Sequence, residues 1–266
     1  MSTSSSSSAP RVAAAKRTAL ITGATSGIGA EFARQLAARR YDLVLVARDT
    51  GRLEMAADSL NLRYGVEVEV LTADLVDDAG LAEVEARLQH PTDRIDLLIN
   101  NAGFGLRKPF DENTIDDEQR HLDLLVRVPM RLTHAALQGM LTNGAGRIIN
   151  VASVAGFIPR GTYGACKAWV ISFSRWANIF YRNRGVSVTA VCPGFVRTEF
   201  HERMRVQTTN IPDWMWLETE QVVREGLRDS LRGRAVSVPS LRYKAAVVLA
   251  TILPKRVTAE QGKRGR

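Results

Sequence analysis

Short apolar runs that alternate with amphipathic helical runs constrain the fold of this chain more than any other feature. The run from Asp42 to Ala47 has four consecutive apolar residues at its centre, which is typical of a strand buried on both faces. A helical stretch follows residues 19–21, with Ile28, Phe32 and Leu36 four residues apart. Further strand-like runs lie near residues 67–72, 95–100, 146–151 and 187–192. Continuous apolar strands separated by helices predict one doubly wound α/β domain, with a parallel sheet covered on both faces.

The domain organisation follows from length and local composition. A chain of 266 residues suits one large domain, and no internal repeat or interdomain linker interrupts it. We expect a disordered Ser-rich tail over residues 1–15, the catalytic domain over 16–254 and a basic tail over 255–266. Within the domain, the Trp-rich segment at about 199–217 breaks the alternating pattern and is predicted to form a substrate lid.

Charge and apolar content limit the classes of partner. The formal net charge is +8, much of it near the chain ends, but no base-reading motif accompanies it, so we expect no specific nucleic acid partner. The longest apolar run, Ala245 to Leu253, is far shorter than the roughly 20 residues of a membrane span, so no transmembrane segment is expected. Cys166 and Cys192 are interpreted as reduced, semi-buried thiols of a cytoplasmic protein, with no bound metal.

A glycine-rich turn between the first predicted strand and helix suggests a phosphate-binding loop. Glycines let the backbone turn tightly and approach a pyrophosphate, and the helix N-terminus presents free N–H groups to it. A structural turn would use glycine as well, so this segment alone leaves both interpretations open. The residues predicted to cradle the phosphates are Gly23, Thr25, Ser26, Gly27, Ile28 and Gly29.

Five motifs in order along the chain carry a family resemblance. The turn has the spacing Gly-x-x-x-Gly-x-Gly. It is followed by Asn100-Asn101-Ala102-Gly103, Ser153, Tyr163-x-x-x-Lys167 and Pro193 to Thr198, each after a predicted strand. This pattern resembles the short-chain dehydrogenase/reductase superfamily, in its NADP-preferring 3-oxoacyl and ketone reductase branch. The resemblance implies a Rossmann-type fold, oxidoreductase activity and a homodimer or homotetramer assembled through the fourth and fifth helices.

The end of the second strand predicts which dinucleotide binds. Enzymes that prefer NAD place Asp or Glu there to hydrogen-bond the ribose 2′-hydroxyl. This chain has Ala47 followed by Arg48, whose guanidinium can pair with the 2′-phosphate of NADP, although Asp49 is an alternative partner for it. By resemblance, the other cofactor contacts are Asp74 and Leu75 at the adenine, Asn101, Ala102 and Gly103 at the ribose, Pro193, Gly194, Val196 and Thr198 at the nicotinamide, and Tyr163 with Lys167.

The predicted catalytic residues are Ser153, Tyr163 and Lys167. Tyr163 and Lys167 lie four residues apart and therefore on one face of a helix. We expect the ammonium to lower the pKa of the phenol toward neutral pH, so that Tyr163 exchanges a proton with the substrate. Ser153 is predicted to donate a hydrogen bond to the substrate oxygen.

One departure from the family pattern concerns the fourth helix, where an asparagine usually completes a catalytic tetrad. That position falls at or near Leu125. Proline cannot bond the carbonyl four residues before it, and Pro129 lies four residues after Leu125. We therefore hypothesise that Pro129 frees the Leu125 carbonyl to hold a water that links Lys167 to solvent.

Uncharged side chains dominate the predicted substrate pocket. Its walls are Phe157, Phe195, Trp214 and Trp216, with Phe104 and Met215 nearby. An apolar pocket predicts NADP(H)-dependent hydride transfer to or from the carbonyl or alcohol of a lipophilic ketone, a steroid-like compound or a 3-oxoacyl thioester. Two alternatives remain: an NAD(H)-linked alcohol dehydrogenase, and a dinucleotide-binding regulator without catalysis.

Overall fold

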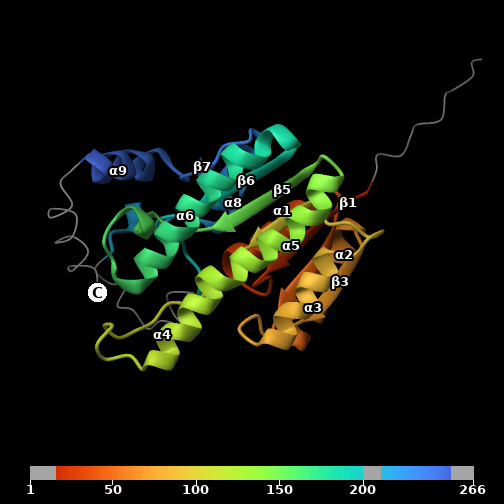
Figure 1. The fold of residues 1–266 in the computed structure, drawn as a ribbon, viewed down its shortest axis with the longest axis horizontal. Coiled ribbons are helices and arrows are strands. Elements are labelled where there is room, and N and C mark those ends of the chain that lie inside the picture. The colour runs from red at the N-terminus through yellow and green to blue at the C-terminus, as the bar shows by residue number, and fades with distance from the viewer. Residues whose placement is uncertain (1–15, 200–210, 253–266) are drawn as a thin grey trace, which may run out of the picture.

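Seven parallel strands form one sheet in the order β3-β2-β1-β4-β5-β6-β7 (Figure 1). The computed structural model describes residues 16–199 and 211–252, so both predicted tails and residues 200–210 of the predicted lid lie outside the described residues. The strands are β1 (Arg17–Thr22), β2 (Tyr41–Ala47), β3 (Val68–Thr72), β4 (Leu97–Asn100), β5 (Gly146–Val151), β6 (Val186–Val191) and β7 (Val236–Ser237).

The helices that connect or follow these strands are α1 (Gly27–Ala37), α2 (Thr50–Tyr64), α3 (Asp78–Leu88), α4 (Ile115–Leu122), α5 (Val128–Thr142), α6 (Gly161–Tyr181), α8 (Thr219–Leu231) and α9 (Leu241–Ile252). Short 3₁₀ turns cover Val154–Phe157, Arg182–Arg184 and Asp213–Met215. The predicted single doubly wound α/β domain is confirmed. Six strands match the predicted runs, whereas the two-residue strand β7 is too short to produce an apolar pattern and was missed.

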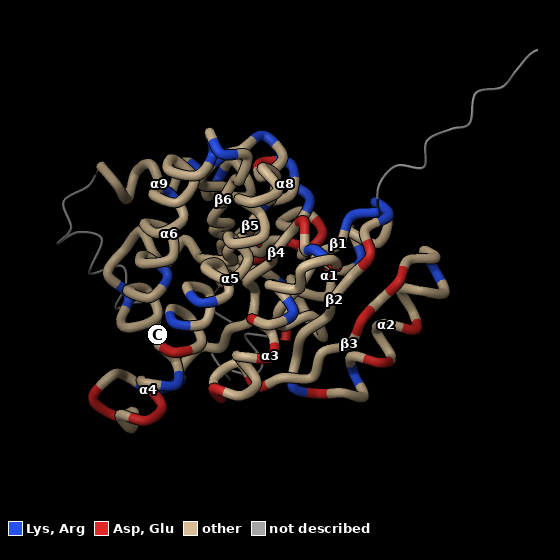
Figure 2. The backbone as a smooth tube through the Cα atoms, turned by 45° about the vertical axis from the view of Figure 1, so that its right-hand side comes forward, with Lys and Arg blue, Asp and Glu red and all other residues tan. Residues whose placement is uncertain are grey.

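Two apolar clusters hold the helices on opposite faces of the sheet. Helices α1, α2 and α8 contribute to one cluster, with Phe32 and Leu36 of α1 almost fully buried. Helices α3 and α5 contribute to the other and lie side by side in Figure 1, while α6 contributes to both. Charged residues line α2, α3 and α4 in Figure 2, whereas β4 and β6 contain none. This burial on both sides explains the continuous apolar run at residues 43–46 of β2.

The order of the sheet reverses between β1 and β4, and in an open parallel sheet this is where the loops after the strands leave a crevice for ligands. The glycine-rich turn follows β1, and Asn101 follows β4. The amide of Asn101 donates hydrogen bonds to the carbonyls of Thr22 and Gly23, at 3.0 and 3.1 Å. The two loops at the reversal are therefore fixed against each other.

The predicted fourth helix is distorted at the place where the sequence carries its unusual residues. A π-helical turn, Asp123–Arg127, separates α4 from α5, and the Val128 N–H bonds the Asp123 carbonyl five residues back. Pro129, which follows at once, has no N–H, so a carbonyl of that turn, at Leu124 or Leu125, lacks its usual backbone donor. The helix therefore changes register beside the candidate site, whereas the hypothesis that the Leu125 carbonyl holds a water stays a prediction.

Candidate active site

The glycine-rich turn has the shape that a dinucleotide phosphate needs. Gly23 and Gly27 have φ of +66° and +54°, a conformation that favours glycine. Helix α1 begins at Gly27, no acidic residue lies in its first turn, and the Ser26 side chain makes no capping hydrogen bond. The positive end of the helix therefore faces the loop, with no acidic side chain in the first turn of α1 itself. These residues fit the pyrophosphate of a dinucleotide.

Several residues predicted to contact the cofactor also stabilise this loop by hydrogen bonding and close packing. The Thr22 hydroxyl accepts hydrogen bonds from the N–H groups of Asn101 and Ala102, both at 3.0 Å. A Cβ on Gly29 would lie 2.1 Å from the Gly23 carbonyl oxygen, so that glycine serves loop packing. Thr22 was missed by the sequence analysis, although its position at the strand end beside Gly23 was a usable signal.

The side chain of Arg48 extends into solvent at the end of β2. It is 71% exposed, and its guanidinium lies 4.0 Å from the Asp74 carboxylate. Asp49, the alternative partner, instead caps α2 by accepting a hydrogen bond from the Arg52 N–H at 3.0 Å. Asp74 also accepts a 2.8 Å hydrogen bond from Arg120. Arg48 and Asp74, both predicted to bind the adenosine half, therefore lie side by side, and the Arg48 guanidinium remains accessible.

The structure brings the three predicted catalytic residues together beyond the end of β5. Ser153 starts the 3₁₀ turn after β5, and its oxygen accepts a 3.1 Å hydrogen bond from the Ala155 N–H. Tyr163 and Lys167 lie in the first turns of α6, and the lysine Nζ is 5.7 Å from the phenol ring centroid. Ser153 also hydrogen-bonds the Tyr163 hydroxyl. This trio has the composition of a proton-donating site: an acid, a hydrogen-bond donor and a cation.

The expectation that Lys167 lowers the pKa of Tyr163 toward neutral pH was wrong. Burial raises the pKa of the phenol above its usual value, and the hydrogen bond from Ser153 and the charge of Arg160 oppose that shift only in part. Burial also lowers the pKa of Lys167 to about 8. The lysine Nζ donates a 2.8 Å hydrogen bond to the Val151 carbonyl. Desolvation is the largest effect on both groups, and the phenol is protonated at neutral pH.

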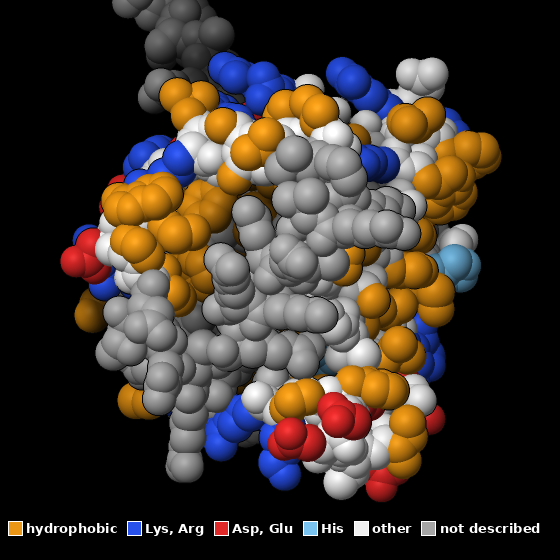
Figure 3. All heavy atoms as spheres, turned by 90° about the vertical axis from the view of Figure 1, so that its left-hand side faces the viewer, with side chains coloured by type: hydrophobic (Ala, Val, Ile, Leu, Met, Phe, Trp, Pro, Cys, Tyr) orange, Lys and Arg blue, Asp and Glu red, His pale blue; other side chains and the backbone are white. Residues whose placement is uncertain are grey.

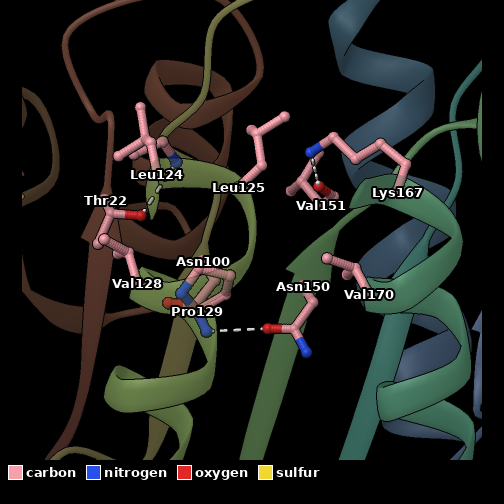
Figure 4. A pocket seen from close by; sticks show the side chains of 11 residues that line it. Thr22, Asn100, Leu124, Leu125, Val128, Pro129, Asn150, Val151, Lys167 and Val170 are labelled. Atoms are coloured by element: carbon pink, nitrogen blue, oxygen red, sulfur yellow. Dashed lines mark hydrogen bonds between the residues drawn. The ribbon is translucent and has the colours of Figure 1, made fainter. Parts of the chain in front are cut away.

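A cavity of about 10 Å³ lies beside Lys167, lined among others by Asn100, Leu125 and Pro129 (Figure 4). The amide nitrogen of Asn100 donates to Asn150 at 2.8 Å, while its oxygen is buried with no hydrogen-bond partner among residues 16–199 and 211–252. A space of this size is just large enough for one water molecule, and the unpartnered Asn100 oxygen offers that water a hydrogen-bond acceptor. The hypothesis of a water near Lys167, Leu125 and Pro129 therefore has a physical site.

The predicted nicotinamide motif packs against the glycine-rich turn. A Cβ on Gly27 would lie 3.1 Å from the Thr198 methyl group. The Pro193 carbonyl accepts a 3.0 Å hydrogen bond from the Val154 N–H, which joins this motif to the turn that carries Ser153. The motif thus contacts both the phosphate-binding loop and the turn that carries Ser153.

The predicted pocket walls divide into two groups. The rings of Phe195 and Trp216 lie 5.8 Å apart. Trp214, in contrast, is 63% exposed, and Phe157 packs against the core with Arg175 over its ring at 5.8 Å. The structure thus brings Phe195 and Trp216 together but not the whole predicted set. On the face shown in Figure 3, hydrophobic side chains gather in several patches.

His121 is a buried residue of the site that the sequence analysis missed. Its ring lies 6.1 Å from that of Tyr163, at 24° between planes, and 5.4 Å from that of Phe104. Neither ring nitrogen has a hydrogen-bond partner in the described part of the chain. Burial lowers the pKa of His121, and the Glu118 carboxylate opposes that shift. The sequence signal that could have identified His121 is its position four residues before Leu125, which predicts that the two side chains lie on the same face of the helix.

The remaining sequence expectations concern metals, membranes and thiols. No group of three or more His, Cys, Asp or Glu side chains within the described ranges could hold a metal ion. None of the helices described has both the length and the apolar character that a bilayer span requires. Cys166 and Cys192 are free thiols, as expected, but both are buried rather than semi-buried, because α6 and the end of β6 pack into the core.

Comparisons with known proteins agree with this geometry. The family model described as short chain dehydrogenase matches residues 17–209. The very-long-chain 3-oxoacyl-CoA reductase of Anas platyrhynchos is 32% identical over 189 residues, which cover 68% of this chain but only 60% of that relative's length. A short-chain dehydrogenase from Sphingobium yanoikuyae, solved in complex with NADPH, is 38% identical with a TM-score of 0.81 and covers 88% of this chain and 93% of its own. The bulky-bulky ketone specific alcohol dehydrogenase from Comamonas testosteroni is 34% identical with a TM-score of 0.77, over 92% and 98% of the two chains.

Proposed function

This chain belongs to the short-chain dehydrogenase family, and we propose that it reduces the carbonyl of a lipophilic ketone with NADPH. Membership makes the chain an oxidoreductase that uses a nicotinamide dinucleotide. The observation that carries the proposal is the trio of Ser153, Tyr163 and Lys167, whose serine turn is joined through the Pro193–Thr198 motif to the phosphate-binding loop.

The protonated phenol of Tyr163 is compatible with the reductive direction. Because burial raises the pKa of the phenol, it carries its proton at neutral pH and is ready to act as a general acid. When bound, the cofactor supplies the hydride. Tyr163 then gives its proton to the oxygen of the carbonyl as negative charge develops there. The Ser153 hydroxyl donates a hydrogen bond to that oxygen, and Lys167 contributes a positive charge close to the phenol ring.

The preference for NADPH rests on the end of β2. Ala47 leaves no carboxylate at the position that would bond a free ribose 2′-hydroxyl, and the exposed guanidinium of Arg48 can approach a 2′-phosphate. The relative from Sphingobium yanoikuyae was solved with NADPH, which supports this assignment.

The lipophilic substrate class rests on the aromatic residues beside the nicotinamide motif. Phe195 immediately follows Gly194, and its ring lies 5.8 Å from that of Trp216. Two large uncharged rings favour the apolar body of a substrate over a sugar. The alcohol dehydrogenase from Comamonas testosteroni, described as specific for bulky-bulky ketones, is consistent with this class.

Incubation of the purified chain with NADPH and a panel of carbonyl compounds tests the proposal. The panel contains a diaryl ketone, a steroid ketone, a 3-oxoacyl thioester and an open-chain sugar ketone, and loss of NADPH is followed by absorbance. We expect turnover with at least one lipophilic ketone and slower turnover with NADH. Exclusive turnover of the sugar, or absence of turnover with every ketone, would overturn the proposal.

A further inference from the structure

A tyrosine of the C-terminal helix α9 bonds both segments that carry the aromatic pair. The Tyr243 hydroxyl donates a 2.7 Å hydrogen bond to the Met215 carbonyl and accepts a 3.1 Å hydrogen bond from the Phe195 N–H. One phenol thus joins the turn after β6 to the segment that precedes α8, although these lie 20 residues apart in sequence.

The Tyr243 ring also explains a glycine that the sequence analysis assigned to cofactor binding. A Cβ on Gly194 would lie 1.9 Å from the Cζ atom of Tyr243 and within 2.3 Å of two further ring atoms. No side chain larger than hydrogen fits while this ring is in place. The turn formed by Pro193, Gly194 and Phe195 therefore packs directly against the Tyr243 ring of α9.

Further bonds hold the same two segments together. The Leu217 N–H donates to the Phe195 carbonyl at 2.8 Å, and the Arg197 N–H donates to the Leu217 carbonyl at 3.0 Å. From α9, the Arg242 guanidinium donates a 2.8 Å hydrogen bond to the Trp216 carbonyl. Tyr243 itself is 6% exposed, so water competes little for its hydroxyl. Burial raises the pKa of its phenol, which keeps the donated proton in place at neutral pH.

From these contacts we propose that Tyr243 is a positioning residue, whose hydroxyl sets the nicotinamide-side turn and the Phe195–Trp216 aromatic pair. The proposal rests on the proposed function, because it assigns that turn and that pair to cofactor and substrate. Tyr243 acts through the backbone of Phe195 and Met215 and touches no reacting atom. Helix α9 thereby contributes, through Tyr243, to the specificity for substrate and cofactor.

The test uses Tyr243→Phe, which keeps the ring against Gly194 and removes only the hydroxyl. Tyr181→Phe, a hydroxyl deletion at the far end of α6, is the matched control. Fluorescence titration compares the affinity of each variant for NADPH and for adenosine 2′,5′-bisphosphate, which lacks nicotinamide. We expect Tyr243→Phe to weaken NADPH about tenfold, because a buried N–H and a carbonyl lose their partner, and to leave the fragment unchanged. Tyr181→Phe should change neither affinity.

Turnover supplies a second measurement. Tyr243→Phe should lower kcat/KM for a diaryl ketone several-fold more than for cyclohexanone, because the small ketone depends less on the aromatic pair. Unchanged affinities together with an unchanged ratio would overturn the proposal. Equal weakening of NADPH and the fragment, with a lower Tm, would also overturn it, because that is the signature of general destabilisation.

The binding measurement separates this proposal from the proposed function. If the wild type binds NADPH but reduces no ketone, the proposed reaction fails while the comparison of NADPH with its fragment still tests Tyr243. Gly194→Ala provides an independent variant. Its methyl group overlaps the Tyr243 ring, so it should reproduce the selective loss of NADPH affinity. A Gly194→Ala variant with unaltered NADPH affinity would contradict the role of this contact.

Discussion

Replacement of Arg48 by alanine should remove most of the preference for NADPH over NADH. The guanidinium is 71% exposed, so its attraction to a 2′-phosphate is partly screened by water. Two opposite unit charges 4 Å apart in water attract by about 1 kcal/mol, and a phosphate carries up to about two charges. The expected loss of about 1–2 kcal/mol corresponds to roughly a tenfold change in the ratio of the two affinities.

Fluorescence titration of both cofactors against wild type and Arg48→Ala measures this change. Asp74→Asn is the companion variant, because the Asp74 carboxylate lies 4.0 Å from Arg48 and opposes a 2′-phosphate; its removal should raise the preference for NADPH. Raising the salt concentration should reduce the preference in the wild type, since exposed charges are screened. Equal wild-type affinities for the two cofactors, or an unchanged ratio in Arg48→Ala, would refute the assignment.

Three further predictions concern the buried lysine, the π turn and assembly. Burial lowers the pKa of Lys167 from 10.5 in the unfolded chain to about 8 in the fold, so the buried ammonium destabilises the fold by about 3 kcal/mol below pH 8. Relative to Lys167→Met, the wild-type free energy of unfolding in urea should therefore rise between pH 8 and 10.5. A difference between the two proteins that stays flat over this range would contradict the prediction. Pro129→Ala restores an N–H that can bond the free carbonyl of the π turn, so that this carbonyl no longer holds the relay water. The variant should therefore slow proton-dependent turnover more than it weakens NADPH binding. Equal effects on turnover and binding would count against a water relay. Trp176 on α6 is 51% exposed and lies beside the exposed Ile179 and Phe180. Trp176→Glu should therefore convert the predicted homodimer or homotetramer to monomer, as measured by light scattering. A wild type that is already monomeric would disprove this assembly.

The sequence predicted the sheet well because continuous apolar strands such as Leu43–Val46 leave few alternatives to burial on both faces. The sequence also predicted that Ser153, Tyr163 and Lys167 lie close together, because Ser153 follows a strand end and Tyr163 and Lys167 share one face of a helix. It could not predict the raised pKa of Tyr163, because the balance between desolvation and charge depends on packing. Tyr243 was missed for a similar reason: its contacts with Phe195 and Met215 are long-range, and no local pattern encodes them.

In the proposed reaction this chain moves a hydride from NADPH to a ketone while Tyr163 supplies the proton. Mass spectrometry of the alcohol formed with NADPH that carries deuterium in the transferable position follows that hydride. We expect one deuterium on the carbinol carbon with the wild type. With Tyr163→Phe we expect at most about a hundredth of the rate at nearly unchanged NADPH affinity. Unlabelled alcohol, or a Tyr163→Phe variant that keeps most of the wild-type rate, would contradict the proposed reaction.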